Sequence, residues 1–93
     1  MACVTIVRKR VVVHGRVQGV WFRDSVRRLA EERGVRGWVC NNADGTVEAV
    51  FEGERERVET LVAFCERGPS GARVERVEVA DEPPEGIDGF AVG

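Results

Sequence analysis

The order in which strand-like and helical segments alternate restricts the folds open to this chain. Valine-rich segments, one of them the continuous run Val11–Val13, flank two segments whose apolar residues recur at helical spacing, and an Asp-Gly pair joins the second and third strand-like segments. β-branched runs favour strands, apolar residues at i, i+4 and i+7 favour an amphipathic helix, and Asp-Gly favours a hairpin. The predicted order is strand, helix, strand, strand, helix, strand, with a short terminal strand. It is typical of the α+β ferredoxin-like arrangement (a split β-α-β unit), an antiparallel sheet with two helices on one face.

The boundaries of these segments follow from local signals. The first helix is expected to begin at Phe22 and to stop at Gly34, a residue suited to the left-handed position after a helix. The second helix is expected to begin near Gly53 and to stop at Gly68-Pro69. The alternation of the fourth strand slips once, which predicts a bulge near Glu75. The strands are expected at residues 5–14, 35–42, 46–52, 72–80 and 87–92.

Composition argues against several classes of protein. The 93 residues are expected to form one domain, residues 1–93, because a chain of this size buries roughly two-thirds of its unfolded surface. A formal net charge of −2 argues against a nucleic-acid or membrane-surface partner, which needs a clustered basic field. No apolar run is long enough to span a membrane, and Met1–Val7 lacks the pattern of a signal peptide. Cys3, Cys40 and Cys65 form neither a disulfide framework nor a CxxC metal pair, so the cytoplasm is the expected compartment. A monomer is expected by default.

The loop between the first strand and the first helix has the chemistry of an anion site. Gly15 and Gly19 bracket this loop, and Arg23 stands where the helix begins. A glycine-rich turn before a helix N-terminus presents backbone N–H groups and a partial positive charge to an anion. The planar guanidinium of Arg23 can bind two oxygens of one phosphate or carboxylate. No Lys-Ser/Thr pair follows the glycines, so the loop is not a P-loop nucleotide site. The sequence therefore predicts a local anion site suited to phosphate.

The predicted topology adds Asn41 to this site. In a ferredoxin-like sheet the end of the second strand borders the same crevice as the loop, which brings Asn41 near Arg23. Asn41 offers an amide donor and a carbonyl acceptor but no titratable proton, so it can orient a water and cannot be a general base. This set suits attack of water on an activated phosphoryl group. It suits an alkyl phosphate ester poorly, because no acid is present to protonate that leaving group.

Two stretches of the sequence resemble the signatures of the acylphosphatase family. Residues 15–23, GRVQGVWFR, resemble the first signature, G-x-V-Q-G-V-x-F-R. Residues 37–48, GWVCNNADGTVE, resemble the second, in which G-[FYW]-[AVC]-x-N precedes x3-G-x-V. With Gly53 also at a family position, the resemblance covers nearly the whole chain. One departure is Cys40, at a position usually basic or polar in the family, whose side chain is expected to point away from Asn41.

This resemblance implies a ferredoxin-like fold and hydrolysis of the carboxyl–phosphate bond of small-molecule acyl phosphates, with no cofactor, metal or covalent intermediate. By the same resemblance, Arg23 binds the phosphate and Asn41 positions the attacking water. The implied phosphate cradle consists of the backbone amides of Arg16, Val17, Gln18, Gly19 and Val20. Because the pattern supplies no protein base, a further hypothesis is that the substrate's own phosphate takes the proton of the water.

Several residues near these motifs have simpler structural interpretations. Gln18 is interpreted as a support of the loop, and His14, without a carboxylate partner, as a strand-end residue. Asp24 is expected to face outward from the first helical turn. The charged run Glu52–Arg57 is interpreted as a solvated helix start. Other aromatic and thiol side chains are interpreted as core, pocket wall or small hydrophobic residues: Trp21, Phe22, Trp38, Cys40 and Cys65.

Two other functions are compatible with the sequence. One is a non-catalytic anion-binding module, since acylphosphatase-like domains also begin larger carbamoyl-phosphate-handling maturation proteins. The chain ends at Gly93 with no cysteine-rich segment, which favours a stand-alone enzyme. The other is an RNA-binding ferredoxin-like domain, which the acidic charge and the lack of the aromatic RNP1 pattern disfavour. Phosphate binding without turnover would favour the module.

Overall fold

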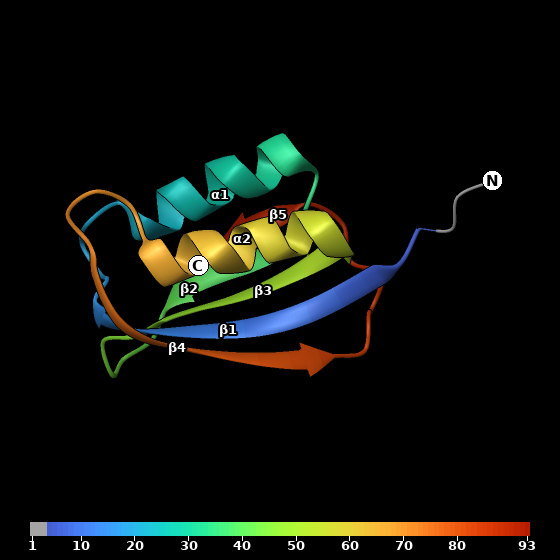
Figure 1. Cartoon of the computed structure of the whole chain (residues 1–93). Helices are drawn as coiled ribbons and strands as arrows, with labels where there is room; N and C mark the ends of the chain where they lie inside the picture. Colours follow the sequence, from blue (N-terminus) through green and yellow to red (C-terminus); the bar gives the residue numbers. More distant parts are fainter. Residues whose placement is uncertain (1–3) are drawn as a thin grey trace.

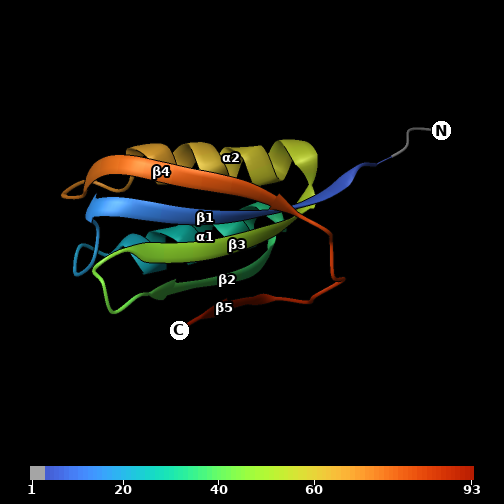
Figure 2. The ribbon, with the colours of Figure 1, turned by 90° about the horizontal axis from the view of Figure 1, so that it is seen from below.

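The computed structural model describes residues 4–93, which form two helices and one five-stranded sheet. Both helices cover the same face of the sheet (Figure 1), and the view in Figure 2 shows the strand order β4-β1-β3-β2-β5. The predicted ferredoxin-like order is confirmed. The elements are β1 (Ile6–Arg16), α1 (Phe22–Arg33), β2 (Arg36–Asn41), β3 (Val47–Glu54), α2 (Arg55–Arg67), β4 (Arg73–Glu82) and β5 (Phe90–Val92). Neither helix has the length and apolar character needed to cross a membrane.

The sheet is mixed rather than wholly antiparallel. β1 pairs antiparallel with β3 and β4, and β2 pairs antiparallel with β3, but β5 runs parallel to β2 with Phe90 opposite Gly37. The reason is the route of residues 83–89, which leave β4 at one edge of the sheet and deliver β5 to the other edge (Figure 2). β5 starts later than expected, at Phe90, because the residues before it belong to this connection.

The predicted bulge in β4 is confirmed, and it lies where β1 turns into the loop. The successive β1 residues His14 and Gly15 pair with Arg76 and Val74, which leaves Glu75 between them without a partner in the register. Gly15 has a φ of 130°, and a Cβ at this position would lie 2.1 Å from a carbonyl oxygen of β4. Glycine is therefore required for β1 and β4 to approach this closely. The bulge and the glycine together set the direction in which the chain enters the loop.

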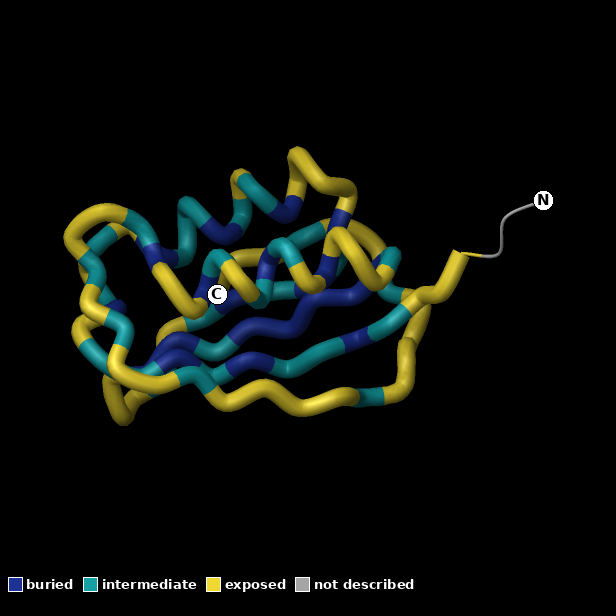
Figure 3. Tube along the Cα trace, viewed as in Figure 1, coloured by how far each residue is buried: buried dark blue, intermediate teal, exposed yellow. Residues whose placement is uncertain are grey.

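The hydrophobic core lies between the sheet and the helices. Inward-facing side chains of β1 and β3 meet those of α1 and α2, and Figure 3 shows the buried positions along these elements. Phe22, Phe51 and Leu61 are the largest fully buried apolar side chains. Burying a side chain of this kind contributes roughly 1.5–3 kcal/mol. Phe22 is the first residue of α1, so its burial also anchors the start of that helix beside the β1–α1 loop.

The opposite face of the sheet carries a buried carboxylate, and the prediction of a solvated charge run is wrong at Glu52. This side chain is fully buried, and it accepts hydrogen bonds from the N–H groups of Glu85 at 2.9 Å and Gly86 at 2.7 Å and from Nη1 of Arg8 at 3.2 Å. Residues 83–89 fold over this end of the sheet, which a local charge pattern does not reveal. Burial by itself raises the pKa of Glu52, but these hydrogen bonds outweigh burial and lower the pKa below its ordinary value.

Candidate functional site

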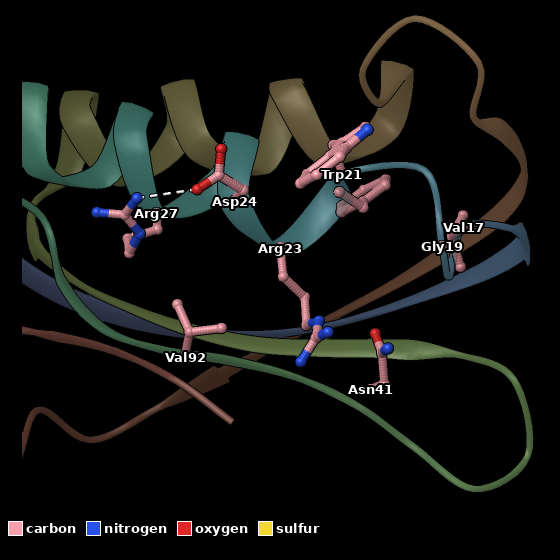
Figure 4. Close-up of a pocket in the computed structure, with 9 residues that line it drawn as sticks. Val17, Gly19, Trp21, Arg23, Asp24, Arg27, Asn41 and Val92 are labelled. Carbon is pink, nitrogen blue, oxygen red and sulfur yellow. Dashed lines mark hydrogen bonds and ion pairs between the residues drawn. The ribbon is translucent and has the colours of Figure 1, made fainter.

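A pocket of about 500 Å³ opens where the β1–α1 loop, the first turn of α1, the end of β2 and β5 meet (Figure 4). Its volume lies in the range of small-ligand sites, roughly 300–1,000 Å³. Arg23 and Asn41 share its wall, although they come from different elements. The lining residues are Val17, Gly19, Trp21, Phe22, Arg23, Asp24, Arg27, Asn41 and Val92.

The β1–α1 loop is held in place by contacts that leave its backbone donors free. The side chain of Val17 is buried and fixes the loop to the core. Nε2 of Gln18 donates to the carbonyl oxygens of Asn42 at 2.8 Å and Thr46 at 2.9 Å, which ties the loop to the β2–β3 turn and agrees with the interpretation of Gln18 as a loop support. Within the described residues, the N–H groups of residues 17–20 donate no hydrogen bond. These donors are available to a ligand.

Arg23 adds a permanent positive charge beside these donors. It lies in the first turn of α1, whose N-cap residue, Trp21, forms no side-chain cap hydrogen bond. Uncapped N–H groups and the helix dipole make this end of α1 favourable for an anion. Figure 4 shows the guanidinium of Arg23 and the side chain of Asn41 directed toward the same space. One guanidinium nitrogen donates to the backbone oxygen of Gly93, and the remaining N–H donors of the fork are left for an anion.

The two successive asparagines at the end of β2 have different surroundings. Asn42 is a turn residue, because its Nδ2 donates to Oγ1 of Thr46 at 3.0 Å and to Oε1 of Glu48 at 3.1 Å. Asn41 ends β2 opposite Val47, lines the pocket, and its carboxamide makes no hydrogen bond with another described residue. Of the two, Asn41 is therefore the one whose side-chain amide has no partner among the described residues.

Asp24 is among the lining residues. Figure 4 shows its carboxylate directed away from the guanidinium of Arg23 and from Asn41, in agreement with the prediction that it faces outward. Its carboxylate accepts hydrogen bonds within its own helix, from Nη2 of Arg27 at 2.9 Å, and it pairs with Nε of Arg28 at 2.9 Å. The hydrogen bond from Arg27, reinforced by the charges of both arginines, lowers the pKa of Asp24. The i, i+3 and i+4 spacing of these residues is the signal that could have revealed this cluster, and with it the pocket residue Arg27.

The three aromatic residues considered from the sequence occupy three different environments. Phe22 is a core residue, and Trp38 lies on the other face of the sheet with the guanidinium carbon of Arg10 5.4 Å from its ring centroid. Trp21 lines the pocket, is 79% exposed, and has a φ of 63°. The other exposed apolar residue of the lining is Val92. The sequence did not predict it, because β5 reaches the pocket only after residues 83–89 cross the sheet.

Some predicted residues lie outside the pocket lining. Arg16, Gln18 and Val20 are not among the lining residues. His14 lies on the opposite face of the sheet from its buried neighbour Val13. The expectation that His14 lacks a carboxylate partner is wrong, because its Nε2 lies 2.5 Å from Oε2 of Glu78 on β4.

The cysteines agree with their interpretation as small side chains, and Cys3 lies outside the described residues. Cys65 is buried, and burial raises the pKa of its thiol to about 12. Cys40 faces away from the core, with Sγ 3.9 Å from Oδ1 of Asn42 rather than beside Asn41. Across residues 4–93, no group of three or more His, Cys, Asp or Glu side chains is arranged to hold a metal ion.

Known proteins share both the sequence and the fold of this chain. The acylphosphatase family profile matches residues 9–92. An acylphosphatase of Rubrobacter xylanophilus is 62% identical over 91% of this chain and 78% of its own length. An acylphosphatase of Thermococcus kodakarensis is 57% identical over 92% of this chain and 94% of its own length. The solved structure of an acylphosphatase from Coxiella burnetii has a TM-score of 0.91 at 38% identity, with 100% of each chain covered. The chain therefore belongs to the acylphosphatase family, the hydrolases of acyl phosphates.

Proposed function

We propose that Arg23 and the backbone amides of residues 16–20 hold the phosphoryl group of an acyl phosphate while Asn41 positions the attacking water. One observation carries the proposal: the amide of Asn41 and the guanidinium of Arg23 line one pocket, beside the N–H groups of residues 17–20, which donate no hydrogen bond within residues 4–93. Arg23 supplies charge that does not titrate in the physiological range, and the loop amides supply directed donors. Such preorganised donors stabilise the charge that develops on the phosphoryl oxygens in the transition state.

Hydrolysis of the acyl phosphate by this set of residues requires neither an acid nor a base from the protein. The water oxygen bonds to phosphorus as the bond from phosphorus to the acyl oxygen breaks, and the electron pair leaves with the carboxylate. A carboxylate has a pKa of about 4, so it departs without protonation at neutral pH. The proton of the water passes to an oxygen of the substrate's own phosphate. Asp24 is the one carboxylate among the lining residues, and its pairing with Arg27 and Arg28 lowers its pKa and makes it a poor base.

The test is phosphate release from benzoyl phosphate by the purified protein. Wild type is expected to turn over without added metal and in the presence of EDTA. Arg23→Ala is expected to lower kcat by about 10²–10³ or more, since Arg23 both binds and stabilises. Arg33→Ala is the matched control, because Arg33 lies in the last turn of the same helix, is exposed and does not line the pocket.

A separate variant tests the proposed role of Asn41. Asn41→Ala removes the free amide at an exposed strand end and leaves the turn contacts of Asn42 in place. It is expected to lower kcat while phosphate still binds. Full activity of Asn41→Ala would rule out the positioning of water by this residue. Binding of phosphate without turnover by wild type would identify a non-catalytic module.

We further propose that residues 1–93 form one domain that acts as a cytoplasmic monomer without a nucleic-acid partner. The family match over residues 9–92 supports one domain, and the free thiols of Cys40 and Cys65 support a reducing compartment. The guanidinium of Arg10 over Trp38 hinders that ring from stacking on a base. Light scattering after gel filtration should give the mass of one chain, and cell fractionation should place the protein with cytoplasmic markers.

A further inference from the structure

The pocket has room for more than a phosphoryl group. A phosphoryl group has the bulk of a few water molecules, each occupying about 30 Å³ in the liquid. It therefore fills only part of a pocket of about 500 Å³. When the phosphoryl oxygens face Arg23 and the loop amides, the acyl group extends away from them toward the open part of the pocket. Two apolar side chains of the lining are exposed, Trp21 at 79% and Val92 at 44%.

We propose that Trp21 is a specificity-determining residue whose indole ring stacks on the acyl group and selects planar aromatic acyl groups over small aliphatic ones. This inference rests on the proposed function, because it takes the phosphoryl group to be held at Arg23. Aromatic pairs in offset or edge-to-face contact gain more than their buried area alone explains. An acyl group the size of an acetyl group is too small to gain this contact.

The backbone of Trp21 supports a functional role. Its φ of 63° and ψ of 21° place it in the left-handed region, and it is the one non-glycine residue with positive φ within residues 4–93. This region disfavours every side chain beyond Gly, Asn and Asp. Burial does not offset the strain here, since 79% of the residue is exposed. Strain of this kind is found mainly at binding and catalytic sites.

The start of α1 fixes the backbone of Trp21. The carbonyl oxygen of Trp21 accepts the first hydrogen bond of α1, from the N–H of Ser25 at 3.0 Å, so the helix fixes its backbone. The buried ring of Phe22, its neighbour, anchors the same turn. In Figure 4 the guanidinium of Arg23 lies between Val92 and Asn41, and Trp21 projects from the start of the same helix. A side chain with two rotatable bonds on a fixed backbone loses little entropy when it binds.

The test compares kcat/KM for benzoyl phosphate and for acetyl phosphate. Trp21→Gly and Trp21→Asn both remove the ring, and both residues adopt the left-handed region, so neither variant is expected to unfold. In both variants, the ratio of kcat/KM for benzoyl phosphate to kcat/KM for acetyl phosphate is expected to fall about two- to tenfold. Most of this fall is expected to come from a higher KM for benzoyl phosphate. Trp38→Phe is the control, because Trp38 lies on the other face of the sheet and does not line the pocket. Its ratio is expected to stay at the wild-type value.

A second readout does not depend on turnover. In Trp38→Phe the ring of Trp21 is the remaining tryptophan, and its fluorescence is expected to change on titration with the non-hydrolysable analogue benzoylphosphonate, with a much smaller change for inorganic phosphate. An unchanged substrate ratio in both Trp21 variants, or an equal loss on both substrates, would overturn the inference while leaving the proposed function in place. Failure of wild type to hydrolyse either substrate would overturn the proposed function. In that case a fluorescence response to benzoylphosphonate would still support the ring contact, and no response would refute it.

Discussion

Because the carboxylate of Glu52 is buried, we expect that replacing this one group causes a large loss of stability. Glu52→Gln keeps the shape of the side chain but removes its charge and replaces one acceptor oxygen by a donor. Three donors surround this carboxylate: the N–H groups of Glu85 and Gly86 and the guanidinium of Arg8, which is 5% exposed. Removing one partner of a buried ion pair costs about 3–5 kcal/mol. The lower end of this range applies here, because Arg8 keeps its ion pair with Glu82 at 3.0 Å. That is a large share of the roughly 5–15 kcal/mol by which a domain is stable.

The assay is thermal unfolding followed by circular dichroism. For a domain of this size 1 kcal/mol shifts Tm by about 4–8 °C, so Glu52→Gln is expected to lower Tm by at least about 12 °C. Glu54→Gln is the matched control, since its carboxylate is 42% exposed and pairs with Arg57 at 3.5 Å. A substitution at such a surface site changes stability by about 0.5 kcal/mol or less.

The result that would refute this reasoning is equal behaviour of the two variants. If Glu52→Gln lowered Tm no more than Glu54→Gln, the carboxylate would not hold residues 83–89 against the sheet. A double-mutant cycle with Arg8→Ala separates the ion pair from the backbone hydrogen bonds, because the N–H donors of Glu85 and Gly86 remain when Arg8 is removed.

Two further predictions concern pH and the loop. The folded-state pKa of Glu52 is lowered, so its contribution to stability is present above the unfolded carboxyl pKa of about 4.3 and is lost as the pH falls through the folded value. Wild-type Tm should therefore fall in acid more steeply than that of Glu52→Gln, and parallel curves would contradict the assignment. Gln18→Ala removes two hydrogen bonds to the β2–β3 turn and is expected to cost about 1–3 kcal/mol and to raise KM, because the loop amides lose their support. Urea unfolding and steady-state kinetics check both effects, and an unchanged KM would show that Gln18 does not order the loop.

Much of the fold could be predicted from the sequence because its signals are local. The apolar spacing that follows Phe22 marks the face of α1 that meets the sheet, and the slip in parity near Glu75 marks the bulge opposite Gly15. Each of these features depends on neighbours within a few positions along the chain.

The errors concern partners that are distant in sequence. Glu52 was expected in solvent, but residues 83–89 cross the sheet and bury it. The same crossing makes β5 parallel to β2. His14 has Glu78 as a partner because β4 pairs beside β1. In each case the local pattern is the same whether the distant segment is present or not, so the sequence pattern carries no information about the contact.

The candidate site likewise has features that follow from the sequence and features that depend on the tertiary structure. The sequence by itself determined the chemical groups: a loop with free amides before a helix, a cation at the first turn, an amide at a strand end, and two signatures of the acylphosphatase family. The tertiary structure decided that Arg23 and Asn41 share a pocket, that Asp24 is paired in its wall, and that Trp21 and Val92 form its exposed apolar surfaces. The physical reason is that the sequence specifies side-chain chemistry and local backbone preference, whereas the distance between residues on different strands follows from strand order and register.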